Sequence, residues 1–132
     1  MILIKEAKTK DEILHAIFLR RKVLVSEYQY SIFENELDSY DLKSKVYIVK
    51  IKDKVIGTAR VWRNGKIFRI SRMAIDKKYR RKGIGSMLIK SIFQDFKNKG
   101  LYLTAPQTTI PFYSKLGFRK TNKTEKGKYH IY

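Results

Sequence analysis

The sequence RMAIDKKYRRKGIGS, residues 72–86, decides how the rest of the chain is arranged. It ends an apolar run, residues 67–75, which we interpret as a buried strand, and it leads into helically spaced apolar residues from Ile84. The basic residues and glycines of the loop between them are Arg80, Arg81, Lys82, Gly83 and Gly85. Because N–H groups at a helix start have no partner within the helix, they can bind anionic oxygens, and glycine lets an anion come close to the main chain. We therefore predict a phosphate-binding loop.

The loop does not match the common nucleotide-binding motifs. A GxxxxGK[ST] motif is absent, and GxGxxG fails because Leu88 stands three residues after Gly85. What remains is R-x-x-G-x-G at residues 80–85, directly after a strand. By itself this pattern fits a basic turn before an ordinary helix equally well.

Composition indicates a single domain that covers residues 1–132, because 43% hydrophobic residues can bury a core of that size. No run of about 18 apolar residues is present, and residues 1–6 are too charged for a signal peptide, so we expect a cytoplasmic protein that does not insert into membranes. The chain has no cysteine and only His15 and His130, so we expect no metal site.

The net charge of +18 lies in one part of the chain. Residues 1–41 carry six Lys or Arg against eight Asp or Glu, whereas residues 42–132 carry 24 against four. This asymmetry suits an anionic cofactor at the basic part and a cationic substrate near the acidic one, although a solvated lysine-rich surface needs no partner. A basic nucleic-acid-binding module is an alternative reading of the same charge.

The remaining patterns predict an α/β protein with a mixed sheet. A strand at the N-terminus precedes a helix from Lys10 to about Glu27, with a T-x-x-E capping box at its start. Its apolar stripe is formed by the pairs Ile13/Leu14, Ile17/Phe18 and Leu24/Val25, with Arg21 inside the stripe and His15 on the opposite face. We expect a short helix at residues 34–40.

Three strands follow as an antiparallel meander: residues 46–51, 55–62 and 67–75, with a type I′ turn at Asn64-Gly65. A helix over residues 84–97 ends near Gly100, and residues 101–104 form a strand parallel to residues 67–75, because a crossover helix joins the two. A short helix at residues 109–116 and a hairpin of residues 118–120 with 128–132 complete the chain. The predicted order is β-α-β-β-β-α-β-α-β-β.

Two segments together resemble the GNAT superfamily of acyl-CoA-dependent N-acetyltransferases. MAI at residues 73–75 with RRKGIG at residues 80–85 looks like the family's acetyl-CoA motif after its fourth strand, and FYSKLGF at residues 112–118 looks like its FY-x-K-L-G-F segment after the fifth. RRKVLVSE at residues 20–27 and E-x-D-x-x-D at residues 36–41 are similar to stretches of the ElaA/YjcF-like subgroup. Departures such as Leu24 in place of Phe fall on the substrate side.

The resemblance implies a GNAT-like fold with splayed central strands and acetyl-CoA as co-substrate, without a metal. The cofactor-binding residues that it implies are Met73, Ala74, Ile75, Arg80, Arg81, Lys82, Gly83, Ile84, Gly85 and Ser86. It also implies that the N–H of Met73 stabilises the thioester oxygen and that Tyr113 protonates the departing thiolate. Without the resemblance, the side chains of Met73 and Tyr113 also suit plain core packing.

The amine side is less defined by the resemblance. Histone-type members have a glutamate base where this chain has Arg69, so Glu27, Glu36, Asp38 or ordered water could activate the amine or only attract it. His130 could line the acceptor site. We expect a small-molecule or peptide amine as acceptor and a monomer or homodimer; the alternatives are the nucleic-acid-binding module and an acyl-CoA-binding protein without turnover.

Overall fold

The computed structural model describes residues 1–27, 43–97, 99–105, 107–125 and 128–131. The chain begins with strand β1 (Ile2–Glu6) and helix α1 (Lys10–Arg20). The predicted capping box is present: the N–H of Glu12 donates to Thr9 Oγ1 at 3.1 Å, and the Glu12 carboxylate accepts from the N–H of Thr9 at 3.2 Å. A π-helical segment, Arg21–Glu27, continues α1 to the predicted end.

Strands β2 (Lys45–Ile51), β3 (Lys54–Asn64) and β4 (Ile67–Ile75) form the predicted antiparallel meander, and β1 pairs with β2. The turn between β3 and β4 differs from the type I′ prediction. Asn64 belongs to the strand pairing, opposite Ile67, and only Gly65 has a positive φ, 67°. A type I′ turn needs a positive φ at both central residues, so this turn is not of type I′. Asn64 is instead the last paired residue of β3.

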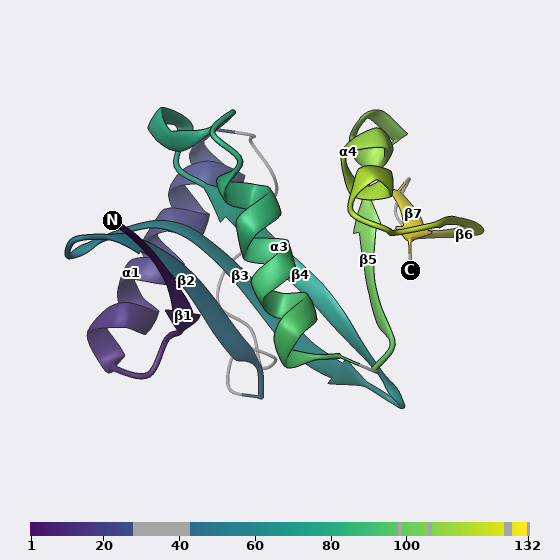
Figure 1. The fold of residues 1–132 in the computed structure, drawn as a ribbon, viewed down its shortest axis with the longest axis horizontal. Helices are drawn as coiled ribbons and strands as arrows, with labels where there is room; N and C mark the ends of the chain where they lie inside the picture. The colour runs from purple at the N-terminus through teal and green to yellow at the C-terminus, as the bar shows by residue number, and fades with distance from the viewer. Residues whose placement is uncertain (28–42, 98, 106, 126–127, 132) are drawn as a thin grey trace.

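Helix α3 (Ile84–Asp95) crosses over to strand β5 (Leu101–Ala105), which runs parallel to β4 as predicted. Their pairing is limited to Phe68↔Leu101 and Arg69↔Tyr102, after which the two strands diverge (Figure 1). Most of β4 is therefore only half-buried, with Ile70 and Ala74 as its buried residues, whereas the apolar pattern had suggested a fully buried strand.

The C-terminal part contains helix α4 (Ile110–Lys115) and strands β6 (Lys120–Glu125) and β7 (Lys128–Ile131). β7 pairs antiparallel with both β5 and β6, so the predicted hairpin is confirmed. Its first strand starts at Lys120, because Phe118 instead turns into the core and packs against Phe93. The strand order of the whole sheet is β1-β2-β3-β4-β5-β7-β6.

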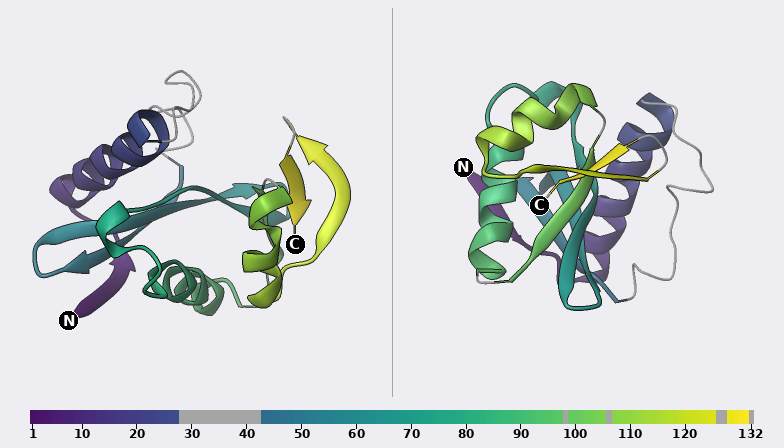
Figure 2. Two further views of the ribbon diagram at one scale, coloured as in Figure 1. Left: turned by 90° about the horizontal axis from the view of Figure 1, so that it is seen from above. Right: turned by 90° about the vertical axis from the view of Figure 1, so that its right-hand side faces the viewer.

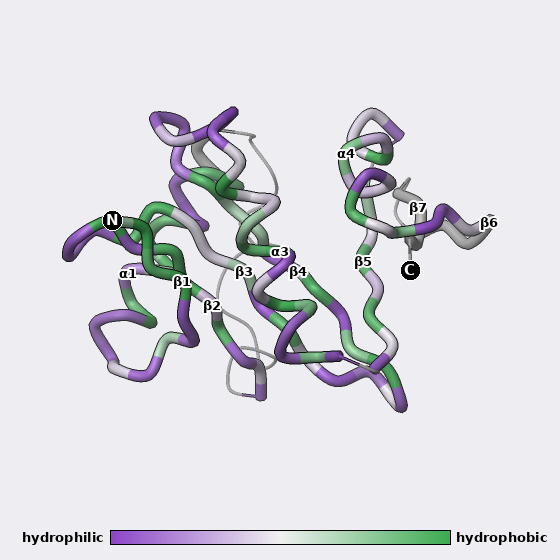
Figure 3. Tube along the Cα trace, viewed as in Figure 1, coloured by the Kyte–Doolittle hydropathy of each residue, from purple (hydrophilic) through white to green (hydrophobic). Residues whose placement is uncertain are grey.

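The sheet is covered by α1 on one face and by α3 on the other (Figure 2). The α3 side holds the larger apolar cluster, which includes Leu88, Ile89 and Ile92, and the α1 side holds a smaller one around Val23, Ile48 and Ala74. The hydrophilic loop between β4 and α3 stands at one end of these apolar layers (Figure 3). This arrangement is the predicted mixed α/β fold with splayed central strands.

The face that α1 turns to the sheet differs from the predicted stripe. Its buried residues are Glu12, Ala16, Leu19 and Arg20. Leu14 and Phe18 are 48% and 63% exposed, and Arg21 is exposed as well, while His15 lies on the surface as expected. The small side chain of Ala16 lets α1 approach the sheet, and two of the four buried residues are charged types, Glu12 and Arg20, which a sequence pattern assigns to the surface. The short helix predicted at residues 34–40 lies outside the described residues.

Candidate functional site

The site forms where β4 and β5 separate. Opposite Ala59, β4 contains a bulge, because the pairing passes from Arg60↔Ser71 directly to Thr58↔Ala74. Within the bulge Arg72 has a φ of 52°, a conformation that non-glycine residues adopt rarely and that recurs at functional sites. The residues of β4 that follow the bulge lie beside the opening between β4 and β5.

The loop after β4 is held by two contacts near its start. Asp76 is buried, and its carboxylate accepts from the N–H of Lys78 at 3.1 Å, which caps a 3-10 turn over Lys77–Tyr79. The Nε–H of Arg80 donates to the carbonyl of Ile75 at 3.0 Å. The loop thus returns on the end of β4 instead of extending into solvent.

The charge of Asp76 is stabilised by this environment. Burial raises the pKa of its carboxyl, but the Lys78 N–H together with the charges of Lys22 and Lys54 outweighs burial, so the pKa lies below its ordinary value. Lys22 Nζ stands 3.7 Å from the carboxylate. Asp76 therefore remains an anion that fixes a loop rich in cations.

The start of α3 has the features of an anion site. Gly83 is the N-cap residue, with a φ of 77° and no side-chain capping bond, and Arg81 also has a positive φ, 61°. The N–H groups of Ile84, Gly85 and Ser86 belong to the first turn, in which the helix offers no acceptor. A Cβ built on Gly85 would stand 3.3 Å from the Met73 side chain and 3.6 Å from that of Phe112, so glycine keeps the helix start close to β4 and α4.

A cavity of about 420 Å³ joins these elements. The residues that line it are Val23, Met73, Ala74, Ile75, Tyr79, Arg80, Arg81, Gly83, Ile84, Gly85, Ser86, Phe112 and Tyr113. Tyr113 is half-buried on α4, and its ring packs edge-on against Phe112 at 5.0 Å and Phe118 at 5.8 Å between ring centroids. An anion at the helix start and a reacting group beside Met73 and Tyr113 would share one continuous space.

The cavity brings together the predicted cofactor residues and Tyr113, with the exception of Lys82. That side chain is exposed, with Nζ 5.7 Å from the ring centre of Tyr79. Sequence reasoning missed three lining residues: Val23, Tyr79 and Phe112. Phe112 could have been predicted, because it adjoins Tyr113 in the FYSKLGF segment. Val23 comes from the π-helical segment, and no local sequence pattern links it to β4.

The predicted acceptor-side residues are placed only in part. Glu27 is the last residue of the π-helical segment, and His130 lies on β7 opposite Thr104 of β5. Glu36 and Asp38 lie outside the described residues. Arg69, at the position of a glutamate base in histone-type enzymes, belongs to the last shared pair of β4 and β5. Its Nη2 donates to Thr104 Oγ1 at 3.3 Å, so its side chain bridges the two strands where they begin to diverge.

Several aromatic rings are buried in the core, among them Tyr47, Phe96, Tyr102 and Phe118. A nucleic-acid-binding face would need its rings exposed among basic side chains, so this placement speaks against that alternative. Within the described part of the chain no helix is long and apolar enough to cross a membrane. In the same part, no group of three or more His, Asp or Glu side chains is arranged to hold a metal ion.

Comparisons with known proteins agree with this geometry. Residues 43–120 match the family profile of the acetyltransferase (GNAT) domain. The uncharacterized N-acetyltransferase YjcF of Bacillus subtilis is 28% identical over 123 residues, which cover 90% of this chain and 86% of YjcF. The predicted likeness to this family, including its ElaA/YjcF-like members, is confirmed.

Solved structures show the same fold. Escherichia coli ElaA superposes with a TM-score of 0.85 at 18% identity, over 99% of this chain and 98% of ElaA. The PaiA N-acetyltransferase of Thermoplasma acidophilum, solved in complex with coenzyme A, has a TM-score of 0.81 at 17% identity, over 99% of this chain and 97% of PaiA.

Proposed function

Since the chain belongs to the GNAT acetyltransferase family and is an acyltransferase, we propose that it moves an acetyl group from acetyl-CoA to a primary amine by direct attack on the thioester. The observation that carries this proposal is the single cavity that joins the end of β4, the start of α3 and Tyr113. We further propose that residues 1–132 act as one domain. The expected cytoplasmic location stays a prediction.

The start of α3 fits the pyrophosphate of coenzyme A. The N–H groups of Ile84, Gly85 and Ser86 would donate to its oxygens, and the glycine at position 85 lets this helix start lie close to β4 and α4. Arg81 and Lys82 are exposed and add positive charge, whereas Arg80 also ties the loop to β4. The complex of PaiA with coenzyme A supports the choice of ligand.

The open side of β4 fits the pantetheine arm. Within the described residues β4 pairs with β5 only at Phe68 and Arg69, so the stretch around Met73 faces the opening between the strands. In this proposal the N–H of Met73 donates to the thioester oxygen, where negative charge develops as the amine attacks.

When bound, acetyl-CoA supplies the acetyl group as a thioester, so that a C–N bond to the amine forms as the C–S bond breaks. The hydroxyl of Tyr113 gives its proton to the departing sulfur, and the proton lost by the amine nitrogen restores the phenol through solvent. Arg69 cannot act as a base, because a guanidinium stays protonated. In this proposal another group therefore takes the proton of the amine, with Glu27, Glu36, Asp38 and ordered water as the candidates.

Thiol release tests this proposal. The chain has no cysteine, so any thiol that appears comes from coenzyme A. We expect micromolar binding of acetyl-CoA and thiol release that requires an added amine. Replacing Tyr113 by Phe should lower kcat by roughly 10²- to 10⁴-fold with unchanged acetyl-CoA affinity.

Tyr102→Phe is the matched control, because the hydroxyl of Tyr102 accepts a hydrogen bond from Asn64 and lies outside the cavity. Binding without thiol release from any amine would favour the acyl-CoA-binding protein without turnover. Lack of binding would refute the proposal, and full turnover by Tyr113→Phe would refute the role of Tyr113.

A further inference from the structure

The cofactor cavity, the space of about 420 Å³ between the end of β4 and the start of α3, has one wall from a distant part of the sequence. Val23 belongs to the π-helical segment that continues α1, whereas the other described lining residues lie in β4, α3, α4 or the loop after β4. Ala74 of β4 lies in the same buried cluster as Val23, while Met73 packs against the cluster on the α3 side. The cavity therefore reaches around the open edge of β4 to the α1 face of the sheet.

The wall at Val23 is held firmly by the surrounding structure. The side chain is only 1% exposed and belongs to a buried apolar cluster that includes Leu19 and Ile48. Nζ of the preceding residue, Lys22, stands 3.7 Å from the carboxylate of Asp76, which ties this segment to the residue that follows β4. A β-branched side chain in a helical backbone strongly prefers one rotamer, and a closely packed cluster resists extra volume. Val23 therefore has little freedom to make room for additional atoms.

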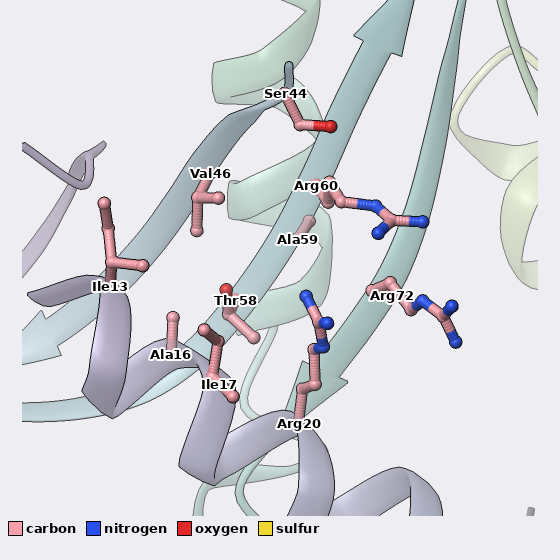
Figure 4. A pocket seen from close by; sticks show the side chains of 10 residues that line it. All are labelled: Ile13, Ala16, Ile17, Arg20, Ser44, Val46, Thr58, Ala59, Arg60 and Arg72. Carbon is pink, nitrogen blue, oxygen red and sulfur yellow. The ribbon is translucent and has the colours of Figure 1, made fainter. Parts of the chain in front are cut away.

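The space beyond this wall belongs to a different cavity. A second cavity, of about 270 Å³, lies between α1 and strands β2 to β4 (Figure 4). It is lined by Ile13, Ala16 and Ile17 of α1 and by residues of the sheet, and it shares no described lining residue with the cofactor cavity. The two spaces are therefore separate, and the cofactor cavity has Val23 at its α1 side without continuing along the helix.

The proposed position of the thioester leaves one direction for the acyl chain. Its carbonyl oxygen faces the N–H of Met73, and its sulfur lies toward Tyr113 and the arm that leads to the start of α3. The bonds of a planar thioester carbon spread evenly in one plane, so the acyl chain points away from both. On the remaining side, across the edge of β4, the cavity is lined by Val23 and Ala74.

From these observations we propose that Val23 determines the length of the acyl group that this enzyme transfers. The methyl group of acetyl packs against Val23, and the further methylenes of longer acyl groups collide with it. This inference rests on the proposed function and names the donor class of that same site, short-chain acyl-CoA with acetyl-CoA preferred. The chemistry does not select the length by itself, because the C–N bond that forms and the C–S bond that breaks are the same for every acyl group. Selection must come from the cavity wall.

Donors of different length test the inference in the wild type. Thiol release is compared for acetyl-CoA, propionyl-CoA and butyryl-CoA, with whichever of spermidine, glucosamine and an alanyl peptide reacts fastest with acetyl-CoA. One methylene too many in an apolar pocket costs roughly 10- to 200-fold in specificity, so kcat/KM should fall at least about tenfold from acetyl-CoA to butyryl-CoA. Equal or higher kcat/KM with butyryl-CoA would overturn the inference.

Two variants connect the selectivity to Val23. Val23→Ala removes as many carbon atoms as butyryl has beyond acetyl, so it should reduce the preference for acetyl-CoA over butyryl-CoA at least about tenfold. Val23→Ile adds one carbon and should lower kcat/KM for propionyl-CoA more than for acetyl-CoA. Calorimetry should show unchanged affinity for free coenzyme A in both variants, because coenzyme A carries no acyl group. An unchanged donor preference in whichever variant folds would overturn the inference.

Val55→Ala is the matched control for the loss of buried volume. Val55 belongs to the same buried cluster as Val23 and is 8% exposed, but it is not among the described residues that line the cofactor cavity. This variant should lose stability in thermal melts, as Val23→Ala does, and keep the donor preference of the wild type. A change of donor preference in Val55→Ala equal to that in Val23→Ala would overturn the inference.

A binding measurement on the wild type separates this inference from the proposed function. If acetyl-CoA binds but no amine gives thiol, the transfer activity is refuted, and NMR of the complex still locates the acetyl group. A nuclear Overhauser effect between the acetyl methyl group and the methyl groups of Val23 supports the inference without any substitution. Saturable binding of acetyl-CoA without this contact overturns it. Absence of binding refutes the proposed function and the inference together.

Discussion

Replacement of Gly83 by Ala tests whether the start of α3 binds the cofactor through its main chain. Gly83 has a φ of 77°, and an added Cβ would meet nothing within 4 Å, so the substitution creates no clash. Its cost is the left-handed backbone itself, about 1–2 kcal/mol for a residue with a Cβ. If the backbone relaxes toward negative φ, the N–H groups of Ile84, Gly85 and Ser86 turn away from their common direction.

Gly65 offers a matched control. It has a φ of 67° in the turn between β3 and β4, with equally open space around its Cβ position. Gly65→Ala and Gly83→Ala should therefore lose similar stability, a fall in Tm of about 3–6 °C per kcal/mol for a chain of this size. Only Gly83→Ala should also lose cofactor affinity.

The expected loss of affinity follows from one hydrogen bond to a charged group, about 1.5–3 kcal/mol. That corresponds to a rise in Kd for coenzyme A of roughly 10- to 150-fold, measured by calorimetry next to thermal melts of the two variants. Wild-type affinity in Gly83→Ala, or an equal loss in Gly65→Ala, would refute the reasoning that this helix start forms the pyrophosphate site.

Two further substitutions address side chains that hold the site and the fold. Asp76→Ala removes the cap on the Lys78 N–H and should cost about 1 kcal/mol of stability and up to several-fold in coenzyme A affinity. Asp76→Asn keeps a capping oxygen and loses only the charge that faces Lys22 and Lys54, so it should cost less in both; similar melts and titrations of the two variants would contradict this. The hydrogen bond from Lys5 and those from the N–H groups of Lys8 and Thr9 lower the pKa of Glu12 to about 2. Its contribution to stability is thus present above its ordinary pKa and is lost as pH falls toward 2, so Glu12→Gln should lower Tm at about pH 6 and have little effect near pH 2; a Tm difference that is independent of pH would disprove it.

The sequence predicted the structure best where one short stretch indicates both the secondary structure and the ligand-binding residues. Residues 72–86 predicted the strand, the loop and the helix in their correct order, because glycine positions, basic residues and apolar periodicity all agree there. The divergence of β4 from β5 followed from the family resemblance alone. It depends on how far two strands stay paired, and no local pattern carries that information.

Helix α1 shows where local reasoning fails. Leu14 and Phe18 form a stronger apolar stripe than the face with Ala16 and Leu19, yet the latter packs against the sheet, where the small side chain of Ala16 lets the helix approach closely. The wrong choice of face also concealed Arg20. The cavity between α1 and strands β2 to β4 is lined by arginines from three elements that lie far apart in the sequence, so only the packed fold brings them together.

The central claim, acetyl-CoA bound along β4 and at the start of α3, is tested most directly by a two-dimensional amide NMR titration. We predict that acetyl-CoA shifts the N–H signals of Met73 and of residues 80–86 most strongly, and that Gly65 stays unaffected. Saturable shifts at those positions would support the account. Lack of saturable binding, or shifts confined to basic residues outside this cavity, would contradict it.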